Sequence, residues 1–73
     1  MTPALAKYRE LMKKFIAGRR ADDAAGLEDD SKEVDDLADE MDPLWYNFTL
    51  DEMHEAEKMV ADIEKELDAE TKQ

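Results

Sequence analysis

The sequence predicts an all-α fold of three helices, in which the second and third form an antiparallel hairpin and the first packs across it. At 73 residues the chain has room for one domain, residues 1–73. Two apolar repeats advance by alternating steps of three and four residues, the spacing of one face of an α-helix. They consist of Val34, Leu37, Met41, Leu44 and Phe48, and of Met53, Ala56, Val60, Ile63 and Leu67.

The first helix is expected over residues 3–18. Thr2 is a favourable N-cap, and Pro3 suits the first helical position because its missing N–H would have no intrahelical partner. Gly18 is the expected end of this helix. The apolar face of the helix comprises Leu5, Tyr8, Leu11, Met12, Phe15 and Ile16.

Residues 19–33 admit two interpretations. In the first, Asp22 caps a second helix that begins directly after it. In the second, Asp30 is the N-cap, Glu33 closes a capping box, and residues 19–29 form a loop. Leu27 lies one heptad before Val34, the first residue of the first repeat, and this spacing favours the longer helix.

The second helix is therefore expected over residues 22–47, with a kink at Pro43. Proline lacks a backbone N–H and disfavours helix at the residue before it, so the helix either kinks there or stops and restarts. Because the apolar repeat stays in phase on both sides of the proline, the kink is favoured.

The third helix is expected over residues 50–69. Thr49 is the N-cap, and Glu52, three residues later, completes a capping box. Phe48 before the cap and Met53 after it have the spacing of a hydrophobic staple. These local patterns predict a sharp elbow between the second and third helices.

Three of the five aromatic side chains lie at this elbow. Trp45 and Phe48 are expected to fill the closed end of the hairpin, whereas Tyr46 is about 100° from Trp45 around the helix and lies off the apolar face. Aromatic residues are enriched in binding hot spots, and charges steer and select the partner. The candidate partner-binding residues are Trp45, Tyr46, Asp35, Asp39 and Asp42.

The charge is divided unevenly along a chain whose net charge is -11. Residues 1–20 hold six basic side chains and one acid, a net +5, whereas residues 21–73 hold four lysines and twenty acids, a net -16. The favoured interpretation is internal: a basic first helix lies against acidic ones. A basic face for nucleic acid is the alternative, and the acidic remainder would repel phosphate.

The residue types argue against an enzyme or a cofactor protein. The chain has no cysteine, and its one histidine, His54, is flanked by Asp51 and Glu57 without the second histidine of a metalloprotease or a di-iron site. No catalytic triad order, P-loop or dinucleotide fingerprint is present. No apolar run approaches the length of a membrane span. We expect a cytoplasmic protein without metal or cofactor.

The stretch LADEMDPLWYNFTLDEM resembles a pattern in short, mostly uncharacterised bacterial proteins. The resemblance covers about the last half of the chain. Phe48 replaces the usual leucine, and Leu50 and Asp51 fit the pattern loosely. The resemblance implies a bacterial helical hairpin with a third helix, and it implies no activity. The matching residues are Leu37, Asp39, Glu40, Met41, Asp42, Leu44, Trp45, Tyr46, Thr49 and Glu52.

From these observations the sequence predicts a small, acidic, non-catalytic protein-interaction module with a basic protein partner. One alternative is a structural helical bundle that self-associates, since a homodimer would add apolar burial to a small core. Another is a nucleic-acid mimic that inhibits a basic partner. Direct binding of nucleic acid is not expected.

Overall fold

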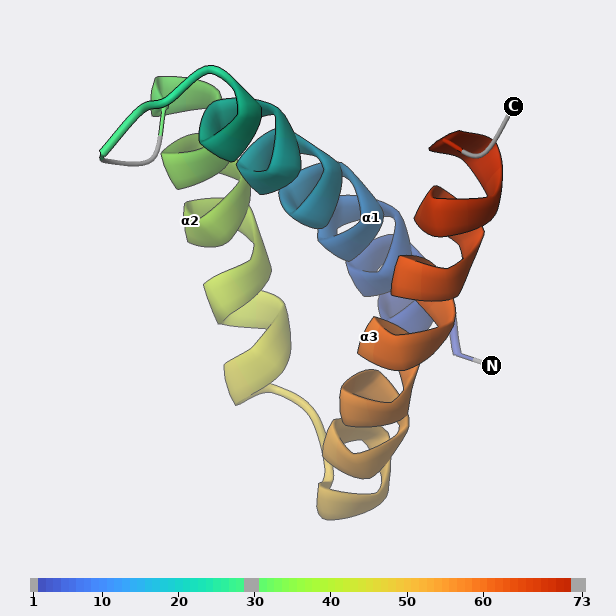
Figure 1. Cartoon of the computed structure of the whole chain (residues 1–73). Coiled ribbons are helices and arrows are strands. Elements are labelled where there is room, and N and C mark those ends of the chain that lie inside the picture. Colours follow the sequence, from blue (N-terminus) through green and yellow to red (C-terminus); the bar gives the residue numbers. More distant parts are fainter. Residues whose placement is uncertain (1, 29–30, 72–73) are drawn as a thin grey trace.

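A computed structural model describes residues 2–28 and 31–71 and consists, within those ranges, of three α-helices without a strand (Figure 1). The helices are α1 (Pro3–Ala24), α2 (Lys32–Tyr46) and α3 (Leu50–Thr71). The predicted all-α class is confirmed. In the described part of the chain, no helix is both long enough and apolar enough to cross a membrane.

Helix α1 packs against both other helices, as predicted. The chain reverses direction at the elbow, and α2 and α3 diverge from it, while α1 passes behind α3 and ends beside the start of α2 (Figure 1). The two apolar repeats were expected to face each other. Their main packing partner is instead α1, and α2 and α3 contact each other only weakly. The resulting arrangement is flat, with extents of 36 × 28 × 16 Å.

The prediction that α1 ends at Gly18 is wrong, because the helix continues to Ala24. The glycine that ends it is Gly26, which has a φ of 78°. The N–H of Gly26 donates to the carbonyl of Asp23 (3.1 Å), and that of Leu27 donates to the carbonyl of Asp22 (3.0 Å). This pair of bonds is a Schellman motif, which satisfies the last carbonyls of the helix.

Gly18 serves a different purpose, which is close contact between α1 and α2. A Cβ atom at this position would lie 2.8 Å from Cγ2 of Val34. Val34 is 1% exposed and belongs to the first turns of α2. The missing side chain therefore lets the two helix backbones approach each other.

The prediction that the second helix starts near residue 22 is also wrong. Asp22 belongs to α1, and its carboxylate accepts a hydrogen bond (2.9 Å) from the backbone N–H of Ser31. Ser31 is the N-cap of α2, and its hydroxyl accepts from the N–H of Val34 (3.4 Å). The alternative cap, Asp30, lies outside the described residues. The helix continues through Pro43 to Tyr46, so the stop-and-restart alternative is excluded.

The predicted N-cap of α1 and the predicted capping box of α3 are confirmed. The hydroxyl of Thr49 accepts from the N–H of Glu52 (3.2 Å), and a carboxylate oxygen of Glu52 accepts from the N–H of Thr49 (3.1 Å). The hydroxyl of Thr2 accepts from the N–H of Leu5 (3.2 Å). At the elbow, the Asn47 side chain donates to the carbonyl at position 43 (2.8 Å), and α2 ends there.

The core is centred on α1 and the elbow. The rings of Tyr8 and Phe48 meet edge to face with centroids 5.2 Å apart, and Trp45 lies 6.1 Å from Tyr8 and 6.3 Å from Phe48. The predicted ring cluster at the elbow is thus completed by a tyrosine of α1. The buried core residues are Leu5, Tyr8, Leu11, Met41, Phe48, Ala56, Met59, Ile63 and Leu67.

The basic side chains of α1 lie against acids of α3, as the internal interpretation of the charge pattern predicted. Arg9 pairs with Glu66, and Lys13 bonds to Glu70 (2.9 Å). These pairs place positive charge of α1 beside acidic side chains of α3. They are exposed pairs, so each contributes little to stability.

Candidate functional site

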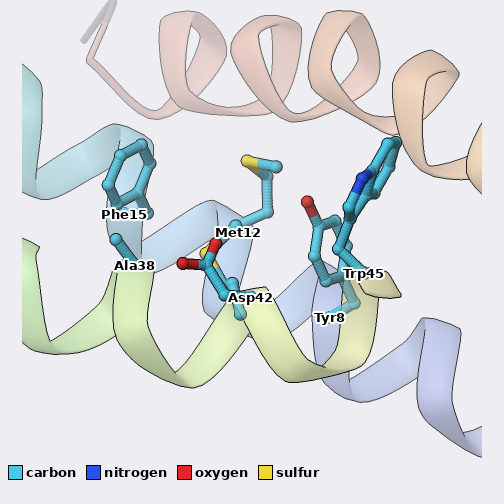
Figure 2. A pocket seen from close by; sticks show the side chains of 7 residues that line it. Tyr8, Met12, Phe15, Ala38, Asp42 and Trp45 are labelled. Atoms are coloured by element: carbon cyan, nitrogen blue, oxygen red, sulfur yellow. The ribbon is translucent and has the colours of Figure 1, made fainter. Parts of the chain in front are cut away.

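An open groove runs along α1 between α2 and α3. It consists of two adjoining cavities of about 360 Å³ each, which share Met12 and Phe15 on the groove floor. Figure 2 shows the first cavity, in which side chains of α1 and α2 are directed into the space between α2 and α3. The first cavity is lined by Tyr8, Met12, Phe15, Ala38, Met41, Asp42 and Trp45. The second is lined by Met12, Phe15, Ile16, Arg19, Arg20, Asp23, Val60 and Glu64.

The groove is open because α2 and α3 diverge over an apolar stripe of α1. Met12, Phe15 and Ile16 pack against the core and yet remain only half-buried. The chain exposes 5434 Å². A folded monomer of this mass, 8.4 kDa, is expected to expose about 4600 Å². The excess is about the area that one partner buries in a standard protein interface.

The two ends of the groove differ in charge. Asp42 is the charged residue of the cavity near the elbow. The far cavity brings together Arg19, Arg20, Asp23 and Glu64, and is mixed in charge. The guanidinium of Arg19 also lies over the ring of Phe15, 5.7 Å from its centroid. The groove is therefore apolar along its floor and acidic at the elbow end.

Tyr8 and Asp42 face the same cavity and affect each other electrostatically. Burial raises the pKa of the Tyr8 phenol above 10.0, and the nearby carboxylate of Asp42 raises it further. The phenol is therefore neutral at physiological pH and can donate a hydrogen bond. Figure 2 shows its oxygen directed away from α2 and toward α3.

The structure brings together two of the five predicted partner-binding residues, Trp45 and Asp42, in the elbow cavity. Tyr46 is 79% exposed and does not line the groove. Asp35 and Asp39 are exposed on α2 and do not line it either. By helical register Asp35 lies on the groove side, in line with residues 38, 42 and 45 of α2.

The residues that sequence reasoning missed are those of the groove floor. Tyr8, Met12 and Phe15 form part of the predicted apolar face of the first helix, which was expected to be covered. Their spacing identifies an apolar stripe but does not show whether neighbouring helices close over it. Ala38 and Val60, on the two walls, gave no separate indication of a site.

Within the described residues no cluster of three or more histidine, cysteine or acidic side chains is arranged to hold a metal ion. His54 is exposed, and its Nδ1 lies 4.0 Å from a carboxylate oxygen of Glu57. Both side chains are exposed, and neither lines the two cavities.

The fold and the groove define the chain as a small three-helix protein with an uncovered apolar face. Comparison with protein-family models, with curated proteins and with solved structures found no match.

Proposed function

We propose that this chain is a small, acidic, non-catalytic protein-interaction module whose groove binds an amphipathic helix of a basic partner. The proposal rests on one observation: the apolar floor of the groove, formed by α1, is left uncovered where α2 and α3 diverge. Amphipathic helices bind in such grooves by inserting apolar anchors at helical spacing. A bound helix would complete a four-helix arrangement and cover the half-buried residues.

The dimensions of the groove fit a short helix. Its lining residues on α1 run from Tyr8 to Asp23, which corresponds to about 22 Å of helix, or about four turns. Apolar residues on three sides can contact such a helix: Phe15 from the floor, Trp45 from α2 and Val60 from α3.

The charge of the chain selects the type of partner. The net charge of -11 favours association with a basic protein and accelerates it at low salt. A second copy of the chain would instead bring the same excess of acid to the interface. We therefore favour a basic partner over a homodimer, and a cytoplasmic setting suits a chain without cysteine.

The proposal can be tested with a designed amphipathic peptide of leucine and lysine, about four turns long. Trp45, the single tryptophan, lies in the groove and reports binding by its fluorescence. We expect a saturable change with one peptide per chain. In Ala38→Glu the groove wall carries a charge, and we expect binding at least about tenfold weaker because a buried charge opposes apolar contact.

The matched control is Ala69→Glu, which adds the same charge at an exposed position of α3 outside the groove. Binding to Ala69→Glu should equal that of the wild-type chain or exceed it slightly. Equal effects of the two substitutions would show that the peptide responds only to net charge, and would overturn the proposal. Sedimentation over a range of concentrations tests the homodimer. If the chain dimerises through the groove, the mass of the sedimenting species should double at high concentration, and the peptide should prevent this dimerisation.

A further inference from the structure

The elbow cavity holds an acidic group with no internal cation. Asp42 has no hydrogen-bond or ion-pair partner among the described residues, whereas Glu66, Asp68 and Glu70 of α3 are all paired with cations of α1. Asp42 lines the same cavity as the rings of Tyr8 and Trp45. An unpaired carboxylate beside aromatic faces is an arrangement that favours a cation from outside.

We propose that this corner, formed by Tyr8, Asp42 and Trp45, binds the guanidinium of an arginine on the partner helix. The inference rests on the proposed function and adds the identity of one side chain of the ligand. The corner supplies three kinds of contact: a carboxylate for a charge-assisted hydrogen bond, a phenol oxygen that can accept one, and ring faces.

The ring geometry favours arginine over lysine. The rings of Tyr8 and Trp45 have centroids 6.1 Å apart and planes inclined by 33°, and both residues line the cavity, so two adjacent aromatic groups border it. A guanidinium is planar, stacks on aromatic faces and can donate two parallel hydrogen bonds to one carboxylate. An ammonium is more strongly hydrated and cannot stack.

The cations of the far cavity do not oppose this binding. Arg19 is eleven residues after Tyr8 on α1, or about 16 Å along the helix. That distance is about twice the Debye length at physiological salt, so the repulsion is largely screened.

The test compares two peptides that differ only in having arginine or lysine at their basic positions. For the wild-type chain we expect the arginine peptide to bind about fivefold tighter by calorimetry, the size of one aromatic-guanidinium contact. Asp42→Asn removes the carboxylate that would hold the guanidinium against the rings, so the ratio of the two affinities should fall to about one. In Asp39→Asn, the same charge change one turn away on exposed surface, the ratio should stay at about five.

The outcomes separate this inference from the proposed function. A ratio that is the same in Asp42→Asn as in the wild-type chain, with Ala38→Glu still blocking both peptides, overturns the arginine corner and leaves the groove proposal standing. A failure of Ala38→Glu to weaken either peptide more than Ala69→Glu does overturns the groove proposal and the arginine corner together.

Discussion

The hydroxyl of Thr2 donates a hydrogen bond to Glu52 across 3.2 Å, which joins the first cap of the chain to the capping box of α3. The same hydroxyl accepts from the N–H of Leu5, and the other oxygen of Glu52 accepts from the N–H of Thr49. One contact therefore aligns the starts of α1 and α3. It fixes the beginning of the groove floor beside the elbow.

Replacement of Glu52 by glutamine should reveal a pH-dependent contribution to stability. The backbone N–H of Thr49 lowers the pKa of Glu52 below 4.5, with the hydroxyls of Thr2 and Thr49 adding to the effect. A carboxyl whose pKa is lower in the folded state stabilises the fold above its unfolded pKa, and this contribution is lost as the pH falls through the lowered value. Urea unfolding should therefore show Glu52→Gln less stable than wild type at neutral pH.

That difference in the free energy of unfolding should shrink as the pH falls below 4.5. Glu55→Gln is the control, because Glu55 is exposed on α3 and takes no part in a cap. A gap between wild type and Glu52→Gln that stays constant with pH would contradict this account of the capping box.

Tyr8 should ionise only above pH 10.0 in the folded chain. Burial is the larger cause of its raised pKa and Asp42 the smaller, so Asp42→Asn should lower the pKa in part. The phenolate absorbance of Tyr8 can be followed alone in a Tyr46→Phe background. Because the folded pKa is the higher one, stability from this group is complete below pH 10.0 and is lost as the pH rises through the folded value. A midpoint at or below 10.0 would refute the burial of the phenol.

The sequence was most informative where structure depends on near neighbours. The caps at Thr2 and Thr49 were predicted because donor and acceptor lie within three residues of each other. The end of α1 was not predicted correctly. Both Gly18 and Gly26 could end a helix, and only tertiary packing distinguishes them. Gly18 lies inside the helix at a close contact with Val34, sixteen positions later, and no local pattern indicates such a contact.

The groove was only partly predictable for the same reason. Trp45 and Asp42 were identified from residue type and position at the elbow. The floor residues Met12 and Phe15 were identified as apolar, but their exposure depends on how far α2 and α3 diverge. That angle depends on how both helices pack on α1, and tertiary packing of this kind leaves no periodic pattern in the sequence.

The ion pair between Arg20 and Asp68 should contribute measurably but modestly to the docking of α3 on α1. Its atoms are 2.8 Å apart, and both side chains are substantially exposed, at 40% and 60%. A double-mutant cycle with Arg20→Ala and Asp68→Ala should give a coupling energy of about 0.2–1 kcal/mol. The coupling should decline in high salt, because exposed pairs are screened. A coupling of zero at low salt would show that the two side chains do not interact in solution.

Gly18→Ala should destabilise the chain even though alanine is the better helix former. In an exposed helix the change stabilises by about 1 kcal/mol. Here the new Cβ would lie 2.8 Å from Cγ2 of Val34, a buried β-branched side chain that has little freedom to rotate away. Overpacking of this kind costs about 1–3 kcal/mol. The free energy of unfolding, measured with urea, should therefore fall by about 1 kcal/mol.

The effect of Gly18→Ala on the free energy of unfolding should change sign when the methyl groups of Val34 are removed. In a Val34→Ala background the clash is gone, so Gly18→Ala should raise the free energy of unfolding by up to about 1 kcal/mol, the intrinsic helix preference. Gly26→Ala is the matched control: its φ of 78° is strained for any side chain, and nothing lies near its Cβ. It should destabilise both backgrounds equally. If Gly18→Ala stabilised the wild-type chain as much as it does the Val34→Ala variant, close contact between α1 and α2 at this point would be excluded.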